Sequence, residues 1–196
     1  MRVLVACEFS GAVRDAFIRR GHDAWSCDLL EGLGDYKHSH IQGDVLKVLA
    51  NRRRYGKWDL MIAHPPCTFL CNSGVRWLHE RPERWQQMDD GAEFFKILLE
   101  AKVPRIAVEN PVMHKYAKAR IGMEFTQSIQ PWQFGHGETK RTCLWLKNLP
   151  PLRPTNIVSG RLPVVHFTSP GPDRGLLRSI TYQGIADAMA DQWGSL

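Results

Sequence analysis

Two prolines directly precede a cysteine in the segment IAHPPCTFLCNSG, which covers residues 62–74 and begins in an apolar run. A cysteine on a loop after a buried strand can act as a nucleophile if its thiolate is stabilised. Pro65 and Pro66 fix the backbone and lack N–H donors, so the loop is rigid and is not hydrogen-bonded into the sheet. Cys67 is therefore a candidate nucleophile, although a free cysteine is usually a small buried apolar residue.

A carboxylic acid and an amide, Glu109 and Asn110, end a second apolar stretch, RIAVEN. Burial at a strand end disfavours the charged form of a carboxyl group, so we expect Glu109 to be able to hold a proton. A thiol beside a protonated carboxyl group suits addition to a heteroaromatic ring, because the acid protonates a ring nitrogen as sulfur adds to carbon. The alternative is a surface carboxylate at the N-terminus of a helix that begins near Pro111.

Three residues near the start of the chain suit an adenosyl ligand. Gly11 lies at the tight point of EFSGAV, between an apolar run and a helical pattern. Asp28 and Asp44 follow later apolar stretches and can accept hydrogen bonds from a ribose diol and an adenine amino group, respectively. Gly11 lacks the G-x-G-x-x-G spacing of dinucleotide-binding proteins, and each aspartate alone could be a helix cap.

Strand-like and helix-like segments alternate along the chain. Apolar or β-branched runs predict strands at 2–7, 23–29, 58–64, 105–110, 126–135 and 141–149. Helical spacing predicts helices at 10–22, 43–53, 92–102, 111–120 and 180–194. This order predicts an α/β fold with a doubly wound, mostly parallel sheet. Ligands bind at the carboxyl ends of such strands, so we expect five side chains to meet at one sheet edge: Glu8, Asp28, Asp44, Cys67 and Glu109.

The composition is that of one soluble domain, which we assign to residues 1–196. Its apolar runs are shorter than the ~20 residues that span a bilayer, and the first is too short for a secretory signal, so we expect no membrane association and a cytoplasmic location. The five cysteines are an odd number without paired zinc-ligand spacing, which argues against a disulfide framework and a metal site. The net charge of +6 permits a polyanionic partner.

These segments together resemble the DNA (cytosine-5)-methyltransferases. DLMIAHPPCTFLCNSG is similar to the Pro-Pro-Cys loop of that family, and IAVENP to its Glu-Asn motif. EFSGAVRDAF resembles the first cofactor motif and ETKRTCLWL the arginine motif. The matches follow the order of the family over about residues 3–146, and 180–194 lies where its last cofactor-side motif would be. The resemblance implies a Rossmann-like fold that binds S-adenosylmethionine.

The resemblance also implies a reaction, methyl transfer from S-adenosylmethionine to carbon 5 of cytosine in DNA. Cys67 would add to carbon 6 of the base, Glu109 would protonate ring nitrogen 3, and Arg141 would hold the base oxygen. Asn110 and Lys140 would lie on the substrate side. The residues that would line the cofactor site are Phe9, Gly11, Asp28, Asp44 and Pro66. A base in duplex DNA would have to be flipped out, at a cost of about a few kcal/mol.

The proline-rich stretch 147–177 lies where members of this family carry a target-recognition domain. A short loop supplies few contacts to base edges. We therefore expect short or relaxed sequence specificity, a partner subunit or oligomer that supplies recognition, or a substrate other than duplex DNA. A compact enzyme of this type would suit a bacteriophage or prophage.

Three alternatives remain open from the sequence. The same chemistry could act on a free cytosine nucleotide, which suits a compact chain. The fold could bind cofactor or nucleic acid without turnover, although Cys67 and Glu109 are both present. A cysteine hydrolase would need a histidine base beside Cys67, and His64 is the candidate.

Overall fold

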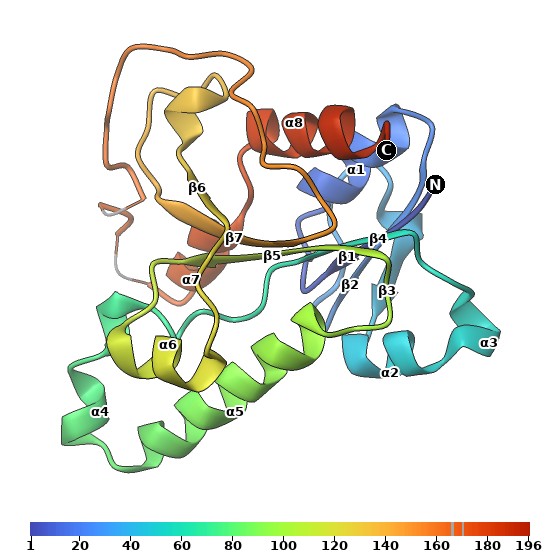
Figure 1. Cartoon of the computed structure of the whole chain (residues 1–196). Coiled ribbons are helices and arrows are strands. Elements are labelled where there is room, and N and C mark those ends of the chain that lie inside the picture. The colour runs from blue at the N-terminus through green and yellow to red at the C-terminus, as the bar shows by residue number, and fades with distance from the viewer. Residues whose placement is uncertain (166, 170) are drawn as a thin grey trace.

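The computed structural model describes residues 1–165, 167–169 and 171–196 (Figure 1). Its centre is a seven-stranded sheet in the order β3-β2-β1-β4-β5-β7-β6. The strands are β1 (Arg2–Ala6), β2 (Asp23–Asp28), β3 (His40–Gln42), β4 (Leu60–Ala63), β5 (Arg105–Pro111), β6 (Gln127–Ile129) and β7 (Thr142–Lys147). The first five strands are parallel, whereas β7 runs antiparallel to both of its neighbours, β5 and β6.

Helices cover both faces of this sheet. The helices are α1 (Ala12–Arg19), α2 (Val45–Ala50), α3 (Arg52–Tyr55), α4 (Trp77–Glu80), α5 (Glu83–Leu99), α6 (Lys115–Ile121), α7 (Arg174–Ser179) and α8 (Gln183–Trp193). α1 and α8 pack on one face, and α2, α5 and α6 on the other (Figure 1). The doubly wound, mostly parallel sheet predicted from the sequence is therefore confirmed.

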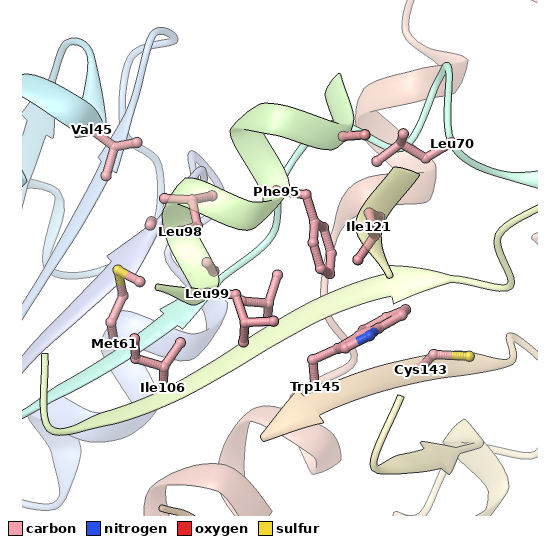
Figure 2. Close-up of a cluster of buried hydrophobic side chains, with 14 of the residues drawn as sticks. Val45, Met61, Leu70, Phe95, Leu98, Leu99, Ile106, Ile121, Cys143 and Trp145 are labelled. Atoms are coloured by element: carbon pink, nitrogen blue, oxygen red, sulfur yellow. The ribbon is translucent and has the colours of Figure 1, made fainter. Parts of the chain in front are cut away.

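The larger core cluster lies between the sheet and the helices α2, α5 and α6 (Figure 2). Phe95 of α5 lies against Trp145 of β7, with the ring centroids 4.9 Å apart in an edge-to-face arrangement. Met61 and Ile106, from neighbouring strands, are fully buried beneath the same helix layer. Each such side chain stabilises the fold by about 1.5–3 kcal/mol through the apolar surface that it removes from water.

The second cluster lies between α1 and α8 on the opposite face of the sheet. Phe17 and Trp193 are fully buried there. Arg20 of the α1 C-cap bonds α8 through Asp187 Oδ1 at 3.1 Å and Asp191 Oδ2 at 2.8 Å. Exposed ion pairs add about 1 kcal/mol or less, so the apolar contact holds α8 in place. This packing brings the end of the chain back to the first strand.

One predicted helix begins later in the structure than the sequence pattern indicates. Pro111 was expected to open a helix, but it is the last residue of β5 and pairs with Thr142 of β7. α6 begins four residues later, where the Nδ1 atom of His114 accepts a hydrogen bond from the backbone N–H of Ala117 at 3.1 Å. The side-chain cap satisfies one free N–H group of the first turn and marks the start of the helix.

Two further boundaries differ from the sequence-based expectations. α5 begins at Glu83, nine residues before the expected start at 92, because the helix extends over a mostly polar first half. The strand expected at 126–135 is limited to β6, since Pro131 opens a 3-10 turn directly after it. The turn that Pro131 opens is η3 (Pro131–Gln133). Other short 3-10 turns are η1 (Lys37–Ser39) and η2 (Asn72–Gly74).

The stretch 147–177 follows the segment 130–139 as an extended loop. Backbone hydrogen bonds join Gly135 N to Asn156 O at 2.8 Å and Thr139 N to Leu162 O at 2.9 Å. Over the part of the stretch that the structure describes, regular structure is confined to the end of β7 and the start of α7. Among the helices of the described residues, none is both long and apolar enough for a membrane span.

Candidate active site

The carboxyl ends of β4 and β5 lie side by side and carry His64 and Glu109. Ala63 pairs with Val108, which fixes the register of the two strands. The Nδ1 atom of His64 is 2.9 Å from Oε2 of Glu109, and the two side chains are only 9% and 14% exposed. Strand side chains alternate between faces, so both project to the face that α1 and α8 cover. The pair is therefore buried next to the C-terminal helix.

Glu109 is ionised in this environment. Burial opposes the charged form, but the hydrogen bond from His64 and the charges of His64 and Lys140 outweigh burial and lower the pKa of Glu109. This corrects the expectation of a carboxyl group that holds its own proton. A carboxylate has no hydrogen to donate, so Nδ1 of His64 is the donor in this bond.

Cys67 opens a tight turn directly after the two prolines. Its carbonyl oxygen accepts hydrogen bonds from the backbone N–H groups of Leu70 and Cys71, each at 3.0 Å. Pro66 is exposed beside Cys67, which is itself half-buried. Cys67 is thus held in a turn of fixed geometry and is partly buried, and its role as a nucleophile stays a prediction.

Asn110 ties this loop to the neighbouring strand. It is buried, and its Nδ2 atom donates to the carbonyl oxygen of Pro65 at 3.2 Å. Its Oδ1 atom is also buried and has no hydrogen-bond partner within the described residues. A substrate contact was expected for Asn110, whereas the structure gives it a role in holding the loop.

The two cysteines of this loop share a hydrogen bond. The bond to Cys71, burial, and the charges of Cys71 and Glu109 raise the pKa of Cys67. Hydrogen bonds to Cys67 and Ser73 lower the pKa of Cys71 to about 5, although burial acts in the opposite direction. Oγ of Ser73 is 3.0 Å from the sulfur of Cys71. At neutral pH the pair therefore carries its charge on Cys71, and Cys67 is a thiol that faces the charge of Glu109.

Lys140 and Arg141 lie on opposite sides of the sheet at the start of β7. The charge of Lys140 acts on Glu109, and its Nζ atom donates to the carbonyl oxygen of Ile180 at 3.3 Å. Arg141 is exposed, and its guanidinium carbon lies 5.8 Å from the ring centroid of Phe125. Lys140 therefore faces the Glu109 side of the sheet and Arg141 the opposite side.

A small cavity of about 10 Å³ lies between this cluster and the segment before α8. Its lining includes His64, Glu109, Lys140 and Tyr182. The space is enough for roughly one water molecule. The hydroxyl of Tyr182 donates to Glu138, and burial and this bond raise the pKa of Tyr182.

Gly11 permits a close approach at the end of β1. Its φ of +78° lies in the left-handed region, and a Cβ there would be 2.7 Å from the carbonyl oxygen of Leu33. The backbone N–H of Leu33 donates to the carbonyl oxygen of Phe9 at 2.7 Å, so the loop after β2 lies over the turn. Phe9 is half-buried at this point. Only glycine fits both the conformation and the space.

Asp28 and Asp44 converge on the end of β1. Their charges, added to the effect of burial, raise the pKa of Cys7. Each uses one oxygen locally: Oδ1 of Asp28 accepts from Leu30 N at 3.0 Å, and Oδ1 of Asp44 accepts from Leu46 N at 2.9 Å and caps α2. Within the described residues the second oxygen of each carboxylate makes no hydrogen bond. The two aspartates are thus helix or turn caps that also retain a free acceptor.

Glu8, which was expected at the same edge, is buried and caps α1. Its two oxygens accept from the backbone N–H groups of Val13 at 2.7 Å and Arg14 at 3.2 Å. Burial raises the pKa of Glu8, while the charge of His64 lowers it in part. His64 therefore lies between two buried carboxyl groups, Glu8 and Glu109.

Comparison with known proteins identifies a related fold. No protein-family model matches the chain, and no curated protein matches its sequence. A solved structure from an E. coli prophage, described as a DNA modification methyltransferase, matches with a TM-score of 0.50 and 14% identity over 87% of this chain and 55% of that one. The shared fold is thus the Rossmann-like fold of a methyltransferase, which the sequence resemblance implies.

Two other solved structures give weaker matches. Entamoeba histolytica methyltransferase EhMeth has a TM-score of 0.46 at 13% identity, over 81% of this chain and 57% of that one. A mutant of Spodoptera frugiperda DNMT2 has a TM-score of 0.38 at 14% identity, over 83% and 55%. The chain spans little more than half the length of each of these three structures.

Sequence reasoning missed two members of the cluster. His64 entered only as the base of a hydrolase, and Cys71 only as one of the five cysteines whose spacing argues against a metal site. Strand alternation places His64 on the same face as Ile62, and the four-residue spacing of Cys67 and Cys71 fits one helical turn. Both signals were present in the sequence.

Proposed function

We propose that this protein is a DNA (cytosine-5)-methyltransferase that uses S-adenosylmethionine and a covalent cysteine adduct. One observation carries the proposal: the loop of Cys67 is bound to the end of β5 through Asn110, so the sulfur lies within electrostatic reach of Glu109. A nucleophile and an acid on neighbouring strand ends suit a flat ring that both must touch. The shared fold with a methyltransferase supports the proposal.

Each residue of the cluster has a role in this proposal. The sulfur of Cys67 adds to carbon 6 of the cytosine, and a proton reaches ring nitrogen 3 through Glu109, which must first take one up. The ammonium group of Lys140 faces the base oxygen in place of Arg141 and stabilises the charge that develops there. Carbon 5 would then carry the methyl group that S-adenosylmethionine supplies. Loss of the carbon 5 proton to water and elimination of sulfur as a thiolate release Cys67, and the proton held by Cys71 returns to it.

Cys67 must lose its proton when it adds to the base. Its thiol already donates a hydrogen bond to Cys71, whose lowered pKa of about 5 makes it a thiolate at neutral pH. We assign Cys71 as the acceptor of this proton in the same step in which the sulfur–carbon bond forms, because transfer to a thiolate of lower pKa is unfavourable on its own. The proton moves by one hydrogen bond.

The cofactor side of the proposal rests on the chemistry of the first three strand ends. Free carboxylate oxygens of Asp28 and Asp44 suit a ribose diol and an adenine amino group, and the turn at Gly11 brings Phe9 beside them. Pro66 is exposed on the catalytic side of this edge. S-adenosylmethionine, when bound, supplies the methyl group.

Base binding requires local opening of the site. The cavity beside Glu109 has room for roughly one water, and a pyrimidine ring needs more. Thr181 and Tyr182 line the cavity, and the segment 180–182 is held by the exposed hydrogen bond from Lys140 to Ile180 and by the bond from Tyr182 to Glu138. We infer that this segment moves when a flipped base enters.

Covalent trapping tests the proposal. The purified protein is incubated with S-adenosylmethionine and a duplex that contains 5-fluorocytosine, which blocks elimination after methyl transfer. We expect a protein–DNA adduct under denaturing conditions, its absence in Cys67→Ala, and its retention in Cys143→Ala, which removes a buried core thiol. Adduct formation by Cys67→Ala, or no adduct with duplex or single-stranded DNA or with the nucleotide, would contradict the proposal.

The short stretch 147–177 favours one alternative, a free cytosine nucleotide as substrate, and the nucleotide arm of the trapping experiment tests it. The hydrolase alternative fits less well. His64 is oriented by Glu109 as a base would be, but the thiol of Cys67 is hydrogen-bonded to Cys71. A protein that binds without turnover would form no adduct in any arm.

A further inference from the structure

The proposed reaction needs a proton that Glu109 alone does not hold. Its pKa is lowered by the hydrogen bond from His64 and by nearby positive charge, so the free protein presents a carboxylate to the site. A carboxylate cannot donate to ring nitrogen 3 of cytosine. A second group must therefore carry the proton and pass it on through Glu109.

His64 is built into the site as a partner for Glu109. Its backbone N–H donates to the carbonyl oxygen of Ala6 at 2.9 Å, and the buried Pro65 follows it, so the residue is fixed at the end of β4. Its Nδ1–H donates to Oε2 of Glu109 at 2.9 Å. The ring therefore has one position and one carboxylate partner.

The other ring nitrogen of His64 has no such partner. Nε2 is buried and makes no hydrogen bond within the residues that the structure describes. A buried polar atom without a partner is costly in a merely structural histidine. It is expected where a ring changes between its neutral and cationic forms during a reaction.

Two buried carboxyl groups flank the ring. Glu8 lies on the β1 side and Glu109 on the β5 side, and the charge of His64 lowers the pKa of each. The other titratable or charged groups that face the pair come from the catalytic loop and from the segments before β7 and α8; they are Cys67, Lys140 and Tyr182. Of Cys67, Lys140 and Tyr182, only Lys140 is positively charged.

We propose that His64 is a positioning residue that stores the proton which Glu109 delivers to the base. The inference rests on the proposed function of this site. The imidazolium N–H bond at Nδ1 breaks as an O–H bond forms on the carboxylate of Glu109. The carboxylic acid then gives one proton to ring nitrogen 3, which leaves a carboxylate and a neutral imidazole with its hydrogen on Nε2. Release of the base returns the proton along the same path.

Two variants separate proton storage from support of the fold. His64→Asn keeps an N–H group near the position of Nδ1, but it cannot be protonated. His64→Leu removes both the bond and the charge. Unchanged circular dichroism and cofactor binding in His64→Asn identify it as a folded protein that lacks only the proton store.

The first measurement is the rate of adduct formation with the 5-fluorocytosine duplex as a function of pH. An imidazolium loses its proton at higher pH than a carboxylic acid does. We expect the rate of His64→Asn at neutral pH to fall about 100-fold, a usual size for loss of general acid catalysis, and to recover as the pH is lowered. A rate that is unchanged, or lowered equally at every pH, would overturn the inference.

The second measurement needs no activity. Carbon-13 NMR of labelled glutamate carboxyl groups follows the titration of Glu109 in the free protein, with Glu109→Gln to assign its signal. We expect the midpoint of Glu109 to rise in His64→Asn and further in His64→Leu, because the cation that lowers it is gone. An unchanged midpoint refutes the inference even if no substrate reacts, whereas failed trapping with a shifted midpoint counts against the proposed function alone.

Discussion

The sequence predicts Cys67 as the nucleophile, whereas the thiolate charge of the pair lies on Cys71. Cys67 has the position of a nucleophile, but its thiol gives a hydrogen bond to Cys71, which is the thiolate of the pair. Two thiols that share one proton titrate in two separated steps. The first step lies well below the ordinary range of a cysteine, and the second well above it.

This separation predicts a measurable titration. The ultraviolet absorbance of thiolates should rise by one group with a midpoint near pH 5, because the bonds from Cys67 and Ser73 stabilise the thiolate of Cys71. Cys71→Ser should lose that step. Cys67→Ala should move it toward the ordinary value of 9.0, since the main stabilising bond is gone. A wild-type protein without an acidic thiolate step would show that the two sulfurs are not paired.

Lys140 and Arg141 provide a matched pair for a second test. Lys140 faces Glu109, whereas Arg141 lies toward Phe125 on the other side of the sheet. We expect Lys140→Met to slow adduct formation by about 100-fold or more, as removal of one charge-stabilising donor usually does. On the same rough scale, we expect Arg141→Met to change the rate of adduct formation by less than about threefold. A larger effect at Arg141 would mean that β7 shifts when the base binds.

Part of this site could be predicted from the sequence by alternation alone. In β4 and β5, His64 shares a face with Ile62 and Glu109 with Ala107, and both faces pack on α1 and α8. Counting back from Thr142 along β7 gives Lys140, not Arg141, for the same face. The protonation of Glu109 could not be predicted, because it depends on distances between strands that are far apart in the chain.

Among the elements, the strands were the most predictable. Runs such as RVLVA and LMIA are apolar at every position because both faces of a central parallel strand are buried. β3 has only three residues and lies at the sheet edge, so its pattern is too short to recognise. The start of α6 depends on a histidine cap, and histidine is not among the usual cap residues.

The turn between β1 and α1 predicts the effect of one substitution. Gly11 and Gly21 both have a left-handed φ, of +78° and +80°, so alanine strains each by about 1–3 kcal/mol. A Cβ at Gly11 would also meet the carbonyl oxygen of Leu33 at 2.7 Å, whereas at Gly21 nothing lies within 4 Å. We expect Gly11→Ala to lower the free energy of unfolding by about 1–3 kcal/mol more than Gly21→Ala does, because of this contact.

Urea unfolding monitored by circular dichroism measures this difference, and calorimetry with S-adenosylmethionine adds a second readout. Gly11→Ala should weaken cofactor binding because the loop after β2 is displaced from Phe9. Gly21→Ala lies at the far end of α1 and should bind normally. Equal stabilities for the two variants would mean that the loop moves away at no cost.

In the molecule as a whole, the polar side chains of the proposed site lie at one edge of the sheet. Helices cover both faces of that sheet. In the proposed function the cofactor would lie at the ends of β1, β2 and β3, and the base at the ends of β4 and β5 and the start of β7. The topology was predictable because strands and helices alternate. The path of the stretch 147–177 was not, since proline-rich segments lack a periodic pattern.

This stretch decides how the protein would read DNA. Sequence is read by side chains that contact base edges in a groove, and it takes a helix, a ribbon or a set of structured loops to place them. Here the segment lies along 130–139, and Arg161 stacks on Trp132 with its guanidinium carbon 3.8 Å from the ring centroid. An arginine held in this way packs on the protein itself and is not free to contact a base.

We therefore expect cytosines in many sequence contexts to be methylated at similar rates. A mixed-sequence duplex library incubated with the protein and S-adenosylmethionine, then read by bisulfite sequencing, measures the rate for each context. Rates should differ by about tenfold or less between flanking sequences, because tenfold corresponds to about 1.4 kcal/mol, near the low end of the about 1–3 kcal/mol that one base contact is worth. Cys67→Ser provides the background. Strict dependence on four or more neighbouring bases would contradict this expectation and would require a recognition surface outside 147–177 or a partner subunit that supplies one.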